Sequence, residues 1–143
     1  MIRWAVDTDR RAIIGLMQLA KMGCSWYDYS NFDGLTLVDI QNNKIVGYVR
    51  FDLGRPETYI RQIVVHPDFQ NTGLIVKRLL LTVMKLAITH GAQGIEGFQP
   101  LDKPWLTEMT NRLGAINQDG VRVRWPLSPK ANEKAEKWLA QIS

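Results

Sequence analysis

Cysteine and histidine are scarce in this sequence, which contains one cysteine, Cys24, and two histidines among 143 residues. A single cysteine cannot form an internal disulfide, so the composition favours a reducing compartment and we expect a cytoplasmic protein. The cysteine and the histidines stand at unrelated spacings that match no metal-site pattern, so no metal is expected. Neither histidine is near Cys24 in sequence, which favours a small, semi-buried side chain over a nucleophile at this position.

Long apolar runs are also missing, because charged residues interrupt every stretch that approaches the roughly 18–20 residues of a membrane-spanning helix. Residues 1–7 lack the basic-then-apolar form of a secretion signal, and we find no repeat, linker or low-complexity tract. With 45% hydrophobic and 22% charged residues, the chain is typical of a globular protein, and its length predicts one domain over residues 1–143. The net charge of +4 suits a phosphate-bearing ligand but is low for a nucleic-acid-binding tail.

Hydrophobic periodicity and turn residues predict a mixed series of strands and helices. Strands are expected at residues 1–6, 35–40, 44–53, 59–65, 94–98 and 121–125. Helices are expected after a cap at residues 7–9 with a stop at Gly23, at 73–90, at 103–113 and from 129 onward. An aromatic, aperiodic loop at residues 24–34 and a turn at 41–43 connect these elements. This order predicts an α/β (α+β) fold with a mixed sheet flanked by helices.

The most informative segment runs from residue 63 to 74, where a β-rich run stops at Pro67 and a polar loop leads into the strongest predicted helix. Unpaired backbone N–H groups and the positive end of the helix dipole form a site for phosphate oxygens at such a helix start. Gly73 would allow close approach of the ligand, and Lys77 and Arg78 would add positive charge. Many strand–loop–helix junctions bind nothing, so an empty turn is the alternative.

The sequence Val65-His66-Pro67-Asp68-Phe69-Gln70-Asn71-Thr72-Gly73-Leu74-Ile75 resembles the signature of the GNAT superfamily of acyl-CoA-dependent N-acyltransferases. That signature, Val-x-Pro-x-x-(Gln/Arg)-x-x-Gly-x-(Gly/Ala), is matched at all but its last position, where Ile75 stands. The predicted element order also resembles this family along nearly the whole chain. Residues 102–104 and 111–115 resemble its second, weaker motif. The resemblance implies a mostly antiparallel sheet that splays at the signature strand.

The resemblance also implies acetyl-CoA as co-substrate and a function as an N-acetyltransferase. A primary amine of a small molecule or peptide would attack the acetyl carbonyl directly. The backbones of Val64 and Val65 would hold the pantetheine arm. The pyrophosphate would lie against the backbone of Gln70, Asn71, Thr72, Gly73, Leu74 and Ile75. Dimers are common in the resembled family, so a homodimer is one expectation.

Three residues or stretches depart from the family pattern. The branched side chain of Ile75 would crowd a backbone meant to touch phosphate. The stretch 59–62 contains no acid where many members carry a carboxylate base, and Thr110 stands where a tyrosine often protonates the leaving thiolate. His66 and Thr110 are therefore weak candidates for catalysis, and a turn or surface role is the alternative for His66. A catalytically degenerate member that serves as a binding or interaction module remains a second reading of the chain.

The acceptor side of the resembled family is lined by the loop that corresponds to residues 24–34. Asp28 and Asp33 could orient a cationic amine there, and Trp26 and Tyr27 could supply an aromatic wall. The alternative is a loop whose aromatic side chains pack down while its acids face water.

A third functional reading, a nucleic-acid binder, draws on the basic pI and on Arg122 and Arg124, which share one strand face. An ordinary exposed charged face is the alternative at these two positions. No membrane partner is expected.

Overall fold

The computed structural model describes residues 1–20, 35–70, 72–98, 111, 116–117 and 122–142 of the chain. The predicted loop 24–34 and almost all of the predicted helix 103–113 lie outside these residues. So do several residues singled out from the sequence, namely Gly23, Cys24, Trp26, Tyr27, Asp28, Asp33, Asn71 and Thr110.

The described strands form a single seven-stranded sheet with the order β1-β2-β3-β4-β5-β7-β6. Their bounds are β1 (Ile2–Trp4), β2 (Leu35–Gln41), β3 (Lys44–Asp52), β4 (Glu57–Val65), β5 (Gly94–Phe98), β6 (Ile116–Asn117) and β7 (Arg122–Pro126). Every neighbouring pair is antiparallel except β4 and β5, which are parallel. The predicted mixed, mostly antiparallel sheet is therefore confirmed.

A tight hairpin joins β2 to β3 at the predicted turn. Gln41 pairs with Lys44, and the two residues between them, Asn42 and Asn43, have positive φ angles of 52° and 64°. Two successive left-handed residues are typical of a type I′ turn, whose twist matches that of the flanking strands, and asparagine tolerates this conformation. The predicted connection at residues 41–43 is thus confirmed.

Helix α1 (Arg10–Leu19) covers one face of the sheet, and it follows a short 3₁₀ helix, η1 (Asp7–Asp9). Its buried side chains Ile13, Leu16 and Met17 pack against Val38, Tyr48 and Val64 of the central strands. The helix ends at Leu19, ahead of the predicted stop at Gly23.

An ion pair anchors the start of this helical region to the sheet. The Asp9 carboxylate accepts hydrogen bonds from Arg3 at 2.7 and 3.0 Å and from the Val6 N–H at 2.8 Å. The hydrogen bonds from Arg3 are the largest cause of a lowered pKa of Asp9, and the same contact raises the pKa of Arg3.

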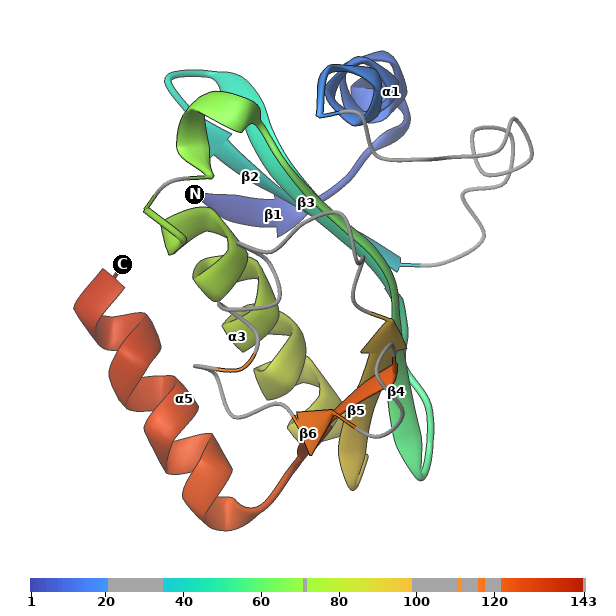
Figure 1. Ribbon diagram of the computed structural model, residues 1–143, viewed down its shortest axis with the longest axis vertical. Helices are drawn as coiled ribbons and strands as arrows, with labels where there is room; N and C mark the ends of the chain where they lie inside the picture. Colours follow the sequence, from blue (N-terminus) through green and yellow to red (C-terminus); the bar gives the residue numbers. More distant parts are fainter. Residues whose placement is uncertain (21–34, 71, 99–110, 112–115, 118–121, 143) are drawn as a thin grey trace.

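Helices α3 (Leu74–His90) and α5 (Pro129–Ile142) cover the opposite face, as Figure 1 shows. Helix α3 buries eight side chains against the sheet and against α5. It ends where predicted, because Gly91 adopts the left-handed conformation, with φ 89°, that glycine permits at a helix C-terminus. On α5, Ala135 is buried, and Trp138 and Leu139 pack against the same core.

Candidate functional site

The candidate site lies at the turn between β4 and α3. A 3₁₀ helix, η2 (Pro67–Phe69), begins directly after β4, and proline suits its first turn because no N–H is needed there. The imidazole Nδ1 of His66 accepts a hydrogen bond from the Asp68 N–H at 3.1 Å, and the His66 ring contacts Phe69 edge-on. His66 therefore shapes the turn, which is the alternative that the sequence left open for it.

Gly73 reverses the chain into α3 with φ 66°, a left-handed conformation that side chains other than glycine rarely adopt. The Leu74 N–H donates a hydrogen bond to Thr72 Oγ1 at 3.2 Å. The Lys77 N–H then reaches the Gly73 carbonyl four residues back, at 3.0 Å. The N–H groups of Ile75 and Val76 stay at the open end of a 17-residue helix, with no intrahelical acceptor. Such a helix start attracts an anion.

Ile75 does not crowd this turn, contrary to the expectation from its place in the signature. Its side chain is 2% exposed and belongs to the core between α3 and the sheet. Space for it comes from Gly47 on β3, where an added Cβ would lie 2.6 Å from Ile75 Cγ2. The signal in the sequence was a glycine within a strand, which often marks close approach of another element.

Lys77 and Arg78, the two cations expected to attract phosphate, have partners elsewhere. The Lys77 ammonium lies 4.9 Å from the ring centroid of Trp138 on α5. Arg78 Nε lies 3.3 Å from a carboxylate oxygen of Asp39, which is completely buried on β2. The part of the predicted anion site that the geometry supports directly is thus its main chain.

One edge of β4 is open beside this turn. Among the described residues, β4 pairs with β5 only from Glu57 to Ile60, opposite Gly94 to Gly97, although β4 continues to Val65. The register of β3 and β4 also shifts so that Arg61 is an extra residue on β4, and such a bulge bends a strand. The expected splay at the signature strand is confirmed, and it begins at this bulge.

Alternation of the backbone determines which groups face the open edge. The His66 N–H donates to the Val46 carbonyl on β3, so the backbone of Val64 also faces β3, whereas that of Ile63 and Val65 faces away. The Val65 carbonyl accepts a hydrogen bond from Gln70 Nε2 at 2.9 Å. The Val65 N–H and the backbone of Ile63 therefore border the splay, and Ile63 was missing from the expected pantetheine-binding residues.

Glu96 is a carboxylate near the splay that sequence reasoning missed. It lies on β5 opposite Tyr59, one position before the last β4–β5 pair. Its neighbour Ile95 is buried on the α3 side, so alternation places Glu96 on the α1 side of the sheet. Its side chain is half-buried and makes no hydrogen bond or ion pair with another described residue. Nothing in the sequence signals it, because the pairing of β4 with β5 joins segments about 37 positions apart.

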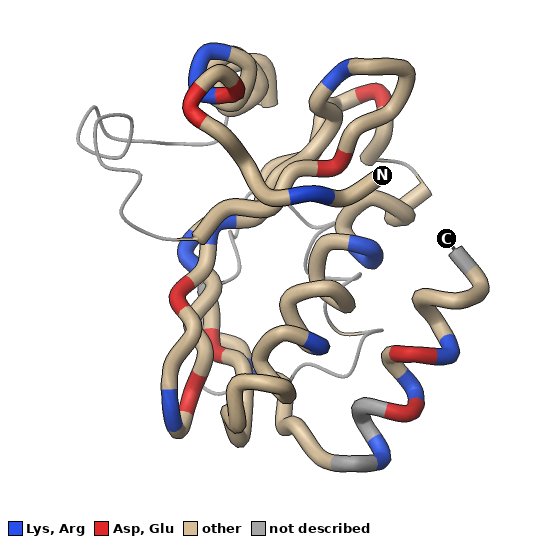
Figure 2. The backbone as a smooth tube through the Cα atoms, turned by 180° about the vertical axis from the view of Figure 1, so that it is seen from behind, with Lys and Arg blue, Asp and Glu red and all other residues tan. Residues whose placement is uncertain are grey.

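Other charged groups around the splay are paired. Arg61 contacts Asp52 at 2.6 Å, and Arg124 contacts Glu57 at 2.7 Å. Arg124 is therefore a half-buried ion-pair partner, not part of an exposed basic strand face. Figure 2 shows acidic and basic residues interspersed along α5 and the strands, without a basic stripe on the described part of the chain.

Among the described residues, no group of three or more His, Cys, Asp or Glu side chains could hold a metal ion. No helix in this part of the chain has the length and apolar character needed to span a bilayer.

Comparison with known proteins places this geometry in context. A model described as the Acetyltransferase (GNAT) family matches residues 4–99. No curated protein matches the sequence. The fold is similar to that of the ribosomal-protein-S18-alanine N-acetyltransferase from Escherichia coli, with a TM-score of 0.78, 18% identity, and coverage of 90% of this chain and 94% of the other.

Two archaeal structures are similar as well. The PaiA N-acetyltransferase from Thermoplasma acidophilum, solved with coenzyme A, gives a TM-score of 0.74 at 15% identity and covers 89% of this chain and 98% of its own. Ard1 from Thermoplasma volcanium gives 0.78 at 12% identity, with coverage of 90% and 97%. At these identities the likeness concerns the fold.

Proposed function

The chain belongs to the GNAT acetyltransferase family, and we propose that it transfers the acetyl group of acetyl-CoA to a primary amine of a small molecule or peptide. The observation that carries this proposal is the continuous path from the splay between β4 and β5 to the anion site at the start of α3. A ligand with a diphosphate at one end of an extended amide-containing arm fits both parts of that path.

The main chain of the turn would hold the diphosphate. The N–H groups of Ile75 and Val76 lie at the open helix end, and Gly73 has no side chain to obstruct an approaching phosphate. The other residues expected from the signature, Gln70, Thr72 and Leu74, surround the same turn.

The open edge of β4 would hold the pantetheine arm. The Val65 N–H and the backbone of Ile63 would pair with the amides of the arm, as a neighbouring strand does elsewhere in the sheet. The open stretch of five residues, 61–65, spans about 16 Å in an extended strand. This length would carry the thioester from the anion site to the bulge at Arg61.

The reaction itself joins the amine nitrogen to the acetyl carbonyl carbon. The bond from that carbon to sulfur then breaks, coenzyme A leaves as a thiolate, and the amine loses one proton. Holding the amine and the thioester together supplies much of the rate enhancement. The thiolate needs little assistance as a leaving group, since thiol pKa values are about 8.5.

Glu96 is our proposal for the group that accepts the amine proton. It is the carboxylate one residue from the last β4–β5 pair, on the α1 side of the sheet, and it has no described partner to neutralise it. Direct contact or one bridging water would suffice for general-base catalysis, which contributes about 10²–10⁴-fold to rate. His66 lies near the other end of the open edge, five residues beyond Arg61, and its Nδ1 is occupied within the turn.

The test is coenzyme binding followed by transfer. Coenzyme A should raise the melting temperature of the protein, and acetyl-CoA should release free thiol when an amine acceptor is present. A degenerate member of the family is the second candidate, favoured by the absence of an acid in residues 59–62. Coenzyme binding without thiol release across a broad panel of amines would select that candidate. Absence of coenzyme binding would refute the proposed transferase and favour an interaction module.

A further inference from the structure

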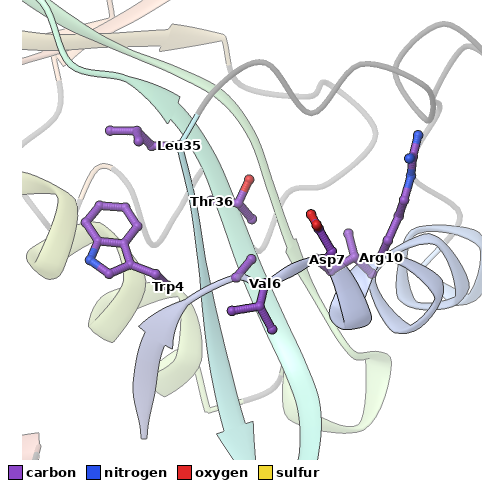
Figure 3. Close-up of a pocket in the computed structure, with 8 residues that line it drawn as sticks. Trp4, Val6, Asp7, Arg10, Leu35 and Thr36 are labelled. Atoms are coloured by element: carbon purple, nitrogen blue, oxygen red, sulfur yellow. The ribbon is translucent and has the colours of Figure 1, made fainter.

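A row of hydrogen-bonding side chains crosses the α1 side of the sheet. Thr36 on β2 lies opposite Arg50 on β3, and Arg50 lies opposite Gln62 on β4. On each strand the residue two positions away packs against α1, so alternation places the row on that side. Figure 3 shows the β2 end of the row, where Thr36 borders a pocket of about 390 Å³ at the start of α1. The other end, at Gln62, lies on the open edge of β4, directly after the bulge at Arg61.

The side-chain amide of Gln62 is held in place from the core. Tyr48 is completely buried in the cluster beneath α1, and its hydroxyl donates a hydrogen bond of 2.9 Å to Gln62 Oε1. Because close packing fixes the tyrosine ring, the hydrogen bond also fixes the orientation of the amide. Gln62 itself is half-buried, so the amide lies at the border between the core and the splay.

The other end of the same amide is open. Gln62 Nε2 makes no hydrogen bond with another described residue. The amide is planar, so an Oε1 directed at the Tyr48 hydroxyl leaves the two N–H donors directed away from it. A donor that is oriented before the ligand arrives costs no reorganisation when it is used. Such a group suits an oxygen atom on which negative charge develops during a reaction.

The position of Gln62 along β4 brings this donor close to the reacting carbonyl group. In the proposed function, the arm of the coenzyme follows β4 from Val65 and brings the thioester to the bulge at Arg61. Gln62 is the residue next to that bulge, and Glu96 lies on the same side of the sheet, across the splay on β5. A carboxylate accepts a proton, whereas the NH₂ end of an amide donates hydrogen bonds. The two side chains therefore suit different atoms of the reaction.

We propose that Gln62 Nε2 donates a hydrogen bond to the acetyl oxygen in the transition state and that Tyr48 is the positioning residue that orients the amide, an assignment that rests on the proposed function. When the amine nitrogen bonds to the acetyl carbon, one electron pair of the C=O bond moves onto the oxygen. The pair returns when the carbon–sulfur bond breaks and coenzyme A leaves as a thiolate. Gln62 neither gains nor loses a proton in these steps, because the proton of the amine goes to Glu96.

Two substitutions of Gln62 separate a donor from a structural role. Gln62→Leu removes the whole amide, whereas Gln62→Glu keeps an oxygen that accepts the hydrogen bond from Tyr48 and removes the NH₂ donor. We expect both variants to lower kcat for thiol release about 10²–10³-fold and to leave KM for acetyl-CoA unchanged, because the lost hydrogen bond belongs to the transition state. A structural role predicts that Gln62→Glu keeps the kcat of the parent. That result, or a higher kcat, overturns the proposal.

Tyr48→Phe tests the positioning role, because it releases the amide and leaves the donor itself unaltered. We expect kcat to fall about tenfold. Combined with Gln62→Leu, it should lower kcat no further, since the hydroxyl acts through the amide. Two losses that multiply in the double variant contradict this role. Gln141→Leu on the exposed part of α5 is the matched control and should keep the kcat of the parent.

A binding measurement tests the donor without turnover. S-carboxymethyl-coenzyme A carries a permanent carboxylate near the position of the acetyl oxygen, and calorimetric titration gives its Kd beside that of coenzyme A. We expect Gln62→Leu to weaken binding of this analogue about tenfold and to leave coenzyme A binding unchanged. An equal effect on both ligands, or none, overturns the assignment of Gln62 while the proposed function stands. A parent protein that binds neither ligand refutes the proposed function, and the inference with it.

Discussion

The replacement Gly73→Glu tests the anion site most sharply. If the diphosphate lies at the start of α3, the new carboxylate stands beside it. Two unit charges 4 Å apart repel by about 4 kcal/mol at an effective dielectric constant of 20. After partial screening by salt, we expect coenzyme A affinity to fall by at least about 100-fold.

Backbone strain must be separated from charge, because Gly73 has φ 66°. Any L-residue in this left-handed conformation costs about 1–2 kcal/mol, which lowers the melting temperature of Gly73→Glu and Gly73→Ala alike. A carboxylate at a helix N-terminus recovers about 0.3–1 kcal/mol in the unliganded protein. Gly73→Glu should therefore be slightly more stable than Gly73→Ala without ligand, and yet bind coenzyme A more weakly.

The assay is thermal unfolding with and without coenzyme A. At a ligand concentration 100 times Kd, binding adds about 2.7 kcal/mol of stability, which raises the melting temperature of a chain of this size by about 5–10 °C. Gly15→Glu is the control, because Gly15 lies on α1 with nothing within 4 Å of an added Cβ. It should keep the full ligand-induced rise. An equal rise in Gly73→Glu and Gly73→Ala would refute the assignment of the diphosphate to this turn.

Three other changes give separate predictions. Glu96→Gln should lower kcat about 10²–10⁴-fold, whereas Glu133→Gln on the exposed face of α5 should not; unchanged kcat removes Glu96 from the mechanism. Gly47→Val should cost about 1–3 kcal/mol in urea unfolding, because an added Cβ would lie 2.6 Å from a core side chain of α3; unchanged stability contradicts this packing. The hydrogen bonds from Arg3 lower the pKa of Asp9. The stability that the Asp9 carboxylate gives to the folded protein is therefore present above the unfolded pKa near 3.8, and it is lost as the pH falls through the lower folded pKa. Asp9→Asn should remove that acid-dependent step from the stability–pH curve, and persistence of the step would assign it to another group.

Local sequence patterns predicted most of the elements because each is encoded by neighbouring residues. The β2–β3 hairpin followed from two asparagines at its turn, and α3 followed from its apolar stripe and Gly91. The turn at Gly73 followed from a family signature and from the conformational freedom of glycine.

Features that depend on distant pairing could not be predicted in the same way. The burial of the Ile75 side chain depends on the space that Gly47 leaves on β3. Arg78 and Lys77 find their partners on β2 and α5, respectively. The two cations stand at a helix start that suits an anion, but tertiary contacts direct their charges elsewhere.

The position of Glu96 depends on strand register. Within the described residues β5 meets β4 over four residue pairs, which neither strand alone reveals. The base that we propose was therefore inaccessible to reasoning along the chain.

The location of the coenzyme is the central claim, and amide chemical shifts measured during a coenzyme A titration test it most directly. The account predicts the largest ¹H–¹⁵N changes at Ile75 and Val76 at the start of α3 and at Val65 on the open edge of β4. Saturable binding whose largest changes fall elsewhere, for example around η1 and the start of β2, would contradict it.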